Sequence, residues 1–101
     1  DCLTLWVNNL LFEAQKNNHP LDEEGIQQAA AQTIEAARSS PATVIFVTNE
    51  VGMGIVPENL AARRFRDLAG RCNQAFAQAA AQVFFLVSGQ PLDIKKPSPN
   101  L

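Results

Sequence analysis

The sequence predicts an α/β fold built around a parallel sheet, and three observations lead to this prediction. The first 40 residues hold two stretches with apolar side chains at helical spacing. Residues 43–47 form a short, β-branched run that is apolar throughout, as in strands covered on both faces. A long helical pattern then separates this run from a second one at 83–87. The order is α, α, β, α, β, and one more strand before Asp1 would give the alternation typical of parallel sheets.

Two helices are predicted before the first strand. From Leu3 to about Lys16 apolar residues recur at helical spacing, and the Asn-Asn-His-Pro sequence at 17–20 ends the pattern. Asp22 can cap the second helix, because its carboxylate accepts hydrogen bonds from the free N–H groups of the first turn. The Ser-Ser-Pro sequence at 39–41 ends that helix.

A long third helix is predicted from Pro57 to about Ala81. Gly70 lies inside it, where glycine costs about 1 kcal/mol relative to alanine, so we expect close packing or a functional reason for it. Residues 83–87 are predicted to form a buried strand and 92–94 a short edge strand. Residues 1–96 are then part of one domain, followed by a Pro-rich tail at 97–101.

Composition limits the classes of function. With 47% hydrophobic and 18% charged residues, the 101-residue chain is expected to be folded and soluble. A formal charge of −2 argues against nucleic-acid binding, and the longest nearly unbroken apolar run, 79–87 with Gln82 inside it, is too short for a membrane span of about 20 residues. Cys2 and Cys72 belong to no CxxC pair, and no leader precedes the folded pattern. We therefore expect a cytoplasmic protein with two reduced thiols, and a chain that starts inside a domain.

Candidate ligand-binding residues follow the predicted strands. In open α/β sheets ligands bind beyond the carboxyl ends of the strands, which singles out Asp1, residues 48–50 and residues 88–89. A carboxylate just past a buried strand is the arrangement that holds Mg²⁺, usually through water, beside nucleotide phosphates. A strand-end Asp can equally cap the helix that follows, so both interpretations of Asp1 remain open.

The third helix carries a polar stripe. At about 100° per residue, one narrow face collects side chains suited to hydrogen bonding and to anions. Its members are Arg63, Arg66, Asp67, Gly70, Asn73 and Gln74. The alternative is a solvated face with an Arg63–Asp67 pair. The glycines at 52 and 54 fit neither GxGxxG nor GxxxxGK[ST], so the loop at 51–56 is not a phosphate loop, and His19 is expected to be an ordinary surface histidine.

Three segments occur in a fixed order along the chain: DCLTLW at 1–6, NEVGMGIVP at 49–57, and RRFRD at 63–67 with Gly70, Asn73 and Gln74. Taken together, they resemble the adenosylcobinamide kinase/adenosylcobinamide-phosphate guanylyltransferases. Residues 87–89 and 92–95 also resemble the last strand of that family and its lysine ending. The likeness covers nearly the whole chain.

The resemblance implies the C-terminal part of a RecA-like P-loop fold. Such an enzyme phosphorylates adenosylcobinamide with a nucleoside triphosphate and then transfers GMP from GTP through a guanylylated histidine. The cofactors implied are GTP, ATP and Mg²⁺, and the family is oligomeric. Family members carry the phosphate loop and that histidine upstream of the position matched by Asp1, so no catalytic residue is expected in this chain, and the isolated chain is expected to be inactive.

The resemblance assigns residues one by one. Asp1 matches the acidic residue associated with GTP and, indirectly, with its metal. Asn49 and Glu50 match the motif at the next strand end, and five residues match the helix motif with roles in ligand binding, domain packing or subunit contact left open. These five are Arg63, Arg66, Asp67, Asn73 and Gln74. Two alternatives stand beside this assignment: a noncatalytic α/β interaction module that uses the helix stripe, and a different P-loop nucleotide kinase.

Overall fold

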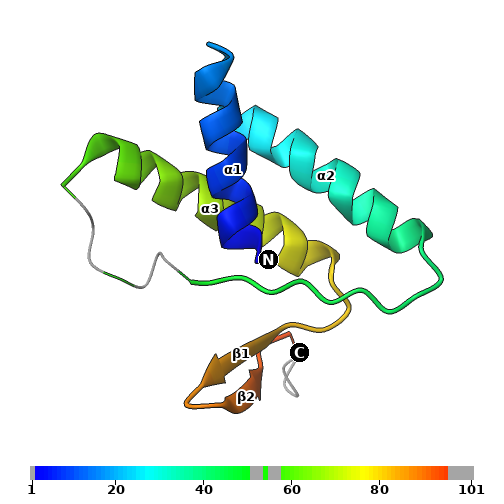
Figure 1. The fold of residues 1–101 in the computed structure, drawn as a ribbon. Helices are drawn as coiled ribbons and strands as arrows, with labels where there is room; N and C mark the ends of the chain where they lie inside the picture. The colour runs from blue at the N-terminus through cyan, green and yellow to red at the C-terminus, as the bar shows by residue number, and fades with distance from the viewer. Residues whose placement is uncertain (1, 51–53, 55–57, 96–101) are drawn as a thin grey trace.

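The structure is a computed structural model that describes residues 2–50, 54 and 58–95. These residues form three helices and one two-stranded sheet, a mixed α/β arrangement that confirms the predicted class. The elements are α1 (Leu3–Lys16), α2 (Glu23–Ser39), α3 (Leu60–Ala79), β1 (Phe84–Val87) and β2 (Gln90–Asp93). Helices α1 and α2 both pack against α3, and the β1–β2 hairpin lies beside this helical layer (Figure 1).

The helix ends follow from capping residues. The side chain of Asp22 accepts a hydrogen bond of 2.8 Å from the Gly25 N–H, which confirms the predicted start of α2. Helix α3 begins at Leu60 because the Asn59 side chain accepts from the N–H groups of Ala61 and Ala62. The predicted start at Pro57 lies outside the described residues, and the helix ends at Ala79 rather than at about Ala81.

The core lies between the three helices. Its buried members come from α1, α2 and the inner face of α3, as the helical spacing predicts. They are Leu3, Val7, Ile26, Ala30, Leu68, Ala69, Cys72 and Phe76. The Trp6 ring meets the Phe76 ring edge-on at a centroid distance of 6.1 Å, so this tryptophan serves packing.

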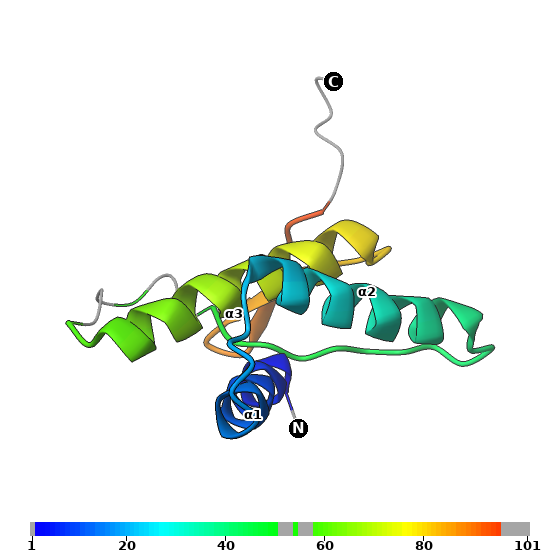
Figure 2. The ribbon, with the colours of Figure 1, turned by 90° about the horizontal axis from the view of Figure 1, so that it is seen from above.

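The predicted strand at 43–47 is not formed. This segment runs extended across the helical layer, and no strand among the described residues pairs with it (Figure 2). A strand exists only where a neighbour supplies ladder hydrogen bonds, and here helices are the neighbours. The Val47 carbonyl accepts from the Leu3 N–H at 2.7 Å, and the Phe46 ring lies 4.7 Å from that of Phe76. The segment is therefore held to the helices by the Phe46 ring and the Val47 carbonyl instead of entering a sheet, and most of its other apolar surface stays exposed.

The prediction of a parallel sheet is also wrong for the described residues. Strand β1 falls within the predicted 83–87 segment, but it pairs antiparallel with β2, and Phe84 lies opposite Asp93. The expected edge strand at 92–94 occurs at 90–93 instead. Ser88 and Gly89 have φ angles of 52° and 76°, so they make the tight two-residue turn that closes a hairpin. This local pairing needs no second strand from elsewhere.

In the part of the chain that the structure describes, we find no helix with the length and apolar character needed to cross a bilayer.

Candidate functional site

Three segments meet in a cluster of polar side chains at the start of α1. Helix α1 contributes its N-cap residue and a first-turn hydroxyl, and α3 contributes an amide. The extended segment, taken from here on as residues 43–49, contributes its last two residues. The members of this polar cluster are Cys2, Thr4, Thr48, Asn49 and Asn73. It joins positions more than 40 residues apart in the sequence.

The start of α1 fixes the extended segment in place. The first N–H groups of a helix have no partner within the helix, so they bind acceptors from outside it. The Leu3 N–H uses the carbonyl of Val47, at 2.7 Å. This bond brings the two residues that follow Val47 next to the first turn of α1.

Asn49 makes reciprocal contacts with the first turn. Its backbone N–H donates to Thr4 Oγ1 at 3.1 Å, and the Thr4 hydroxyl donates to Asn49 Oδ1 at 3.2 Å. The Cys2 thiol lies 3.7 Å from the same amide oxygen. Asn49 is thus held through both its backbone and its side chain.

Asn73 ties the same segment to α3. Its side-chain Nδ2 donates to the Asn49 carbonyl at 3.0 Å, and its Oδ1 accepts from the Thr48 hydroxyl at 2.6 Å. Asparagine is a poor helix former, yet it stands in the interior of α3, where a carboxamide can serve as donor and acceptor at once. Asn73 therefore bridges two consecutive residues of the extended segment.

The two cysteines lie in contrasting environments. The pKa of Cys2 is lowered, chiefly through the backbone N–H of Leu5 in the first helical turn, while burial acts in the opposite direction. Burial raises the pKa of Cys72 to about 11. Both thiols are free. Cys2 belongs to the polar cluster, and Cys72 belongs to the core.

The structure unites only part of the predicted site. Asn49 and Asn73 come together as described, whereas Asp1 lies outside the described residues. Four other candidates are exposed and take no part in the hydrogen bonds of the cluster: Glu50, Arg63, Asp67 and Gln74. Arg66 is half-buried on α3. Residues 88–89, predicted to share an edge with 48–50, form the hairpin turn and make no hydrogen bond to them within the described chain.

The start of α3 has a shallow hollow of about 440 Å³ between Leu60, Arg63, Arg64 and Asp67. The alternative Arg63–Asp67 ion pair does not form between these two described side chains. The ion pair that does form joins Arg71 Nε to Glu23 Oε1 at 3.4 Å and links α3 to α2. Arg64 donates to the Leu21 carbonyl, so this guanidinium also serves packing between helices.

Gly70 does not have the close packing that its position predicts. Apart from its chain neighbours and the nearby backbone of α3 itself, a Cβ placed there would meet no described atom within 4 Å. Of the two reasons expected for this glycine, close packing is therefore not found among the described residues, and a functional reason stays a prediction.

Sequence reasoning missed Thr4 as a separate member of the site. Its hydroxyl makes two of the bonds that hold Asn49. The one signal in the sequence was its place in the first turn of a helix that follows a candidate ligand-binding position. A threonine there is also an ordinary first-turn residue, so the spacing alone does not reveal the contact.

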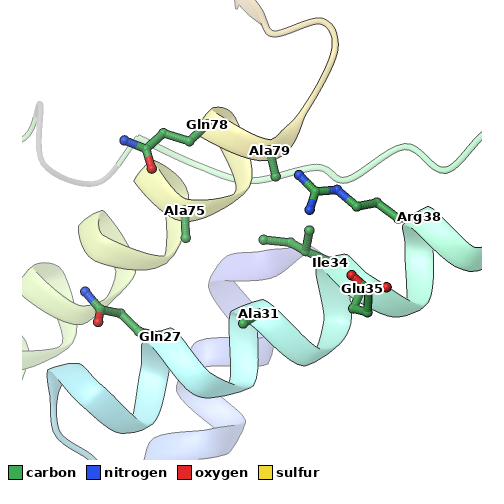
Figure 3. Close-up of a pocket in the computed structure, with 8 residues that line it drawn as sticks. All are labelled: Gln27, Ala31, Ile34, Glu35, Arg38, Ala75, Gln78 and Ala79. Atoms are coloured by element: carbon green, nitrogen blue, oxygen red, sulfur yellow. The ribbon is translucent and has the colours of Figure 1, made fainter.

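A second concavity of about 390 Å³ lies between α2 and α3 and shares no residue with the polar cluster. Ile34 and Arg38 of α2 reach toward Ala79 of α3 across it (Figure 3). Small alanine side chains on both helices leave this groove open. Its charged lining residues, Glu35 and Arg38, take no part in the hydrogen bonds of the polar cluster.

The described residues do not by themselves compose a magnesium site. Mg²⁺ in nucleotide enzymes is held by one or two carboxylates, by phosphates and by water. The polar cluster offers hydroxyl and amide oxygens that already bond to one another, and the described residues contain no group of three acidic, histidine or cysteine side chains suited to a metal. The cluster is therefore suited to holding segments in place rather than to ligating a metal ion.

Comparison with known proteins relates the chain to one family. A model of the cobinamide kinase/cobinamide phosphate guanyltransferase family matches residues 1–94. The bifunctional adenosylcobalamin biosynthesis protein CobU of Salmonella typhimurium is 48% identical over 101 residues, and that of Escherichia coli is 46% identical. The protein CobP of Pseudomonas aeruginosa is 38% identical over 95 residues.

The relatives are longer than this chain. Each match covers 94% of the chain but 56% of the two CobU proteins and 51% of CobP, so the chain spans about half the length of these relatives. The family model nevertheless covers both the polar cluster and the whole of α3. The chain belongs to the cobinamide kinase/cobinamide phosphate guanyltransferase family.

Proposed function

We propose that this chain is part of a bifunctional enzyme of adenosylcobalamin synthesis. The enzyme phosphorylates adenosylcobinamide with a nucleoside triphosphate and then transfers GMP from GTP to adenosylcobinamide phosphate. The observation that carries the proposal is the family match over residues 1–94, supported by relatives named as bifunctional adenosylcobalamin biosynthesis proteins.

The finer assignments form part of the same proposal. The whole enzyme is a RecA-like P-loop protein of the cytoplasm that acts as a homo-oligomer on GTP or ATP. Asp1 is the acidic residue that faces the nucleotide and contacts Mg²⁺ through water. In nucleotide enzymes the metal neutralises charge on the phosphates, and a nearby carboxylate orients it. The chain contains no GxxxxGK[ST] sequence, so residues 1–101 alone should not turn over nucleotide.

The test uses a protein of the relatives' full length that contains residues 1–101. Purified protein is incubated with adenosylcobinamide, Mg²⁺ and either ATP or GTP, and the corrinoid products are identified by mass spectrometry. The expected products are adenosylcobinamide phosphate and, with GTP, adenosylcobinamide-GDP. A corrinoid that keeps its original mass with both nucleotides would contradict the proposal.

A variant measured in the same assay tests the role of Asp1. The variant Asp1→Asn keeps the size of the side chain and removes its charge. A carboxylate that orients metal-bound nucleotide predicts a loss of about 10- to 100-fold in kcat/KM. Activity equal to that of the unchanged protein would remove Asp1 from the site and leave the reaction itself in place.

A further inference from the structure

We infer that Thr4, Thr48 and Asn73 are positioning residues that act on nucleotide chemistry through Asn49. The inference rests on the proposed function and extends it to side chains that need not touch the substrate. It starts from the hydrogen bonds of the polar cluster, which fix Asn49 from two sides.

The two positions held by the cluster adjoin candidate ligand residues. Cys2 directly follows Asp1 in the sequence, and Asn49 directly precedes Glu50. Thr4 binds Asn49 from α1, and Asn73 binds it from α3. The cluster therefore fixes the start of α1 relative to the segment that leads into Glu50.

Stability alone does not account for this arrangement. Thr48 and Asn49 are exposed, and Thr4 and Asn73 are only half-buried, so water could satisfy the same groups. Exposed hydrogen bonds contribute little net free energy, while the core beneath is made by Leu3, Cys72 and Phe76. What the bonds add is a defined geometry between three segments.

Geometry of this kind matters in phosphoryl and nucleotidyl transfer. Catalysis there depends mainly on positioning, and side chains that orient a ligating residue commonly change activity by about 10- to 100-fold when they are lost. A shift at the start of α1 would misplace Asp1, which the proposed function sets beside the nucleotide, and a shift of the segment before Glu50 would misplace a second candidate ligand residue. The positioning residues should therefore affect nucleotide use more than folding.

The first experiment compares Thr4→Val with Thr4→Ser in the full-length enzyme. Valine keeps the shape of threonine and removes the hydroxyl that makes both bonds to Asn49, whereas serine keeps it. We expect kcat/KM for GTP to fall about 10- to 100-fold in Thr4→Val and to recover in Thr4→Ser. Thermal unfolding should shift by less than about 4 °C, the change that about 1 kcal/mol produces in a protein of that size.

A second variant tests the opposite side of Asn49. Asn73→Asp preserves shape and an acceptor for Thr48 but replaces the donor that binds the Asn49 carbonyl with a carboxylate oxygen. It should lower kcat/KM at least as much as Thr4→Val, with separate values of kcat and KM showing which step is affected. Asn9→Ala, an exposed residue of α1 outside the cluster, is the matched control and should leave the kinetics unchanged.

The outcomes separate this inference from the proposed function. A full-length enzyme with neither activity contradicts the proposed function, and the inference falls with it. An active enzyme whose Thr4→Val and Asn73→Asp variants match it in kcat and KM overturns the positioning role alone. Loss of activity that only follows a matching loss of thermal stability, and that Thr4→Ser fails to restore, overturns it as well.

Discussion

The side-chain ammonium of Lys95 donates a hydrogen bond of 2.7 Å to the backbone carbonyl of Ala77 in the last turn of α3. The same ammonium binds the carbonyls of Gln78 and Ala80. The last carbonyls of a helix have no partner within it, and a cation there also offsets the negative end of the helix dipole. A residue beyond β2 thus caps a helix that ended before β1.

Replacement of Lys95 should therefore destabilise α3. Lys95→Met keeps the length of the side chain and removes its charge, and we expect a loss of about 1 kcal/mol in the free energy of unfolding. Urea denaturation followed by circular dichroism measures it. The control is Lys16→Met at the end of α1, where the side chain is exposed. Equal effects of the two substitutions would contradict a specific cap by Lys95.

The N-cap of α2 gives a second prediction. Asp22→Ala removes the acceptor for the Gly25 N–H and should cost about 1 kcal/mol, while Asp22→Ser restores an acceptor and most of the stability. The denaturant midpoints of the three proteins provide the measurement. A serine variant no better than the alanine variant would show that the hydrogen bond is not the source of the effect.

Ile26 should be the most sensitive apolar position of α2. Its side chain is fully buried, so Ile26→Ala leaves a cavity and should cost about 2–5 kcal/mol. The control is Ile45→Ala, the same substitution at a residue that is 80% exposed. It should cost less than about 0.5 kcal/mol. Chemical denaturation of both variants compares them directly, and similar losses would mean that the core is not where the structure places it.

Alkaline pH should weaken the fold through Cys72. Its pKa rises from the usual 9.0 to about 11 on burial, so between these values the folded state keeps a proton that the unfolded state has lost. Stability from this thiol is fully present below pH 9 and is lost as pH rises toward 11. Denaturant midpoints at about pH 8 and about pH 10 should therefore differ more for the unchanged protein than for Cys72→Ala. An equal difference would assign the pH dependence to other groups.

The fold could be predicted where local chemistry decides it. The helical spacing of Leu3 and Val7 and the capping carboxylate of Asp22 act over a few residues, so the helices emerged correctly. The predicted strand at 43–47 would need a neighbouring strand for its hydrogen bonds, and the local sequence does not show whether one is present. In the structure the neighbours of this segment are helices. Val83 to Val87 looked like a buried strand, but the turn at Ser88 and Gly89 allowed a local antiparallel partner.

The candidate site, like the fold, could be predicted only where the local sequence decides it. Asn49 and Asn73 were identified by their motifs, but their mutual contact needs the three-dimensional path of the extended segment. Thr4 is an unremarkable first-turn residue until Asn49 lies beside it. The residues of the predicted stripe all lie on helix α3, yet among the described residues only Asn73 of them hydrogen-bonds within the polar cluster.

Residues 43–47 of the extended segment also affect the solubility of the 101-residue chain. Val44, Ile45 and Val47 expose between 44% and 80% of their surface, and no charge or proline interrupts the run. Short β-branched stretches of this kind stack readily into fibrillar aggregates. Overexpression of the bare chain should give inclusion bodies, and a solubility-enhancing fusion or a gatekeeper charge such as Ile45→Lys should move it into the supernatant.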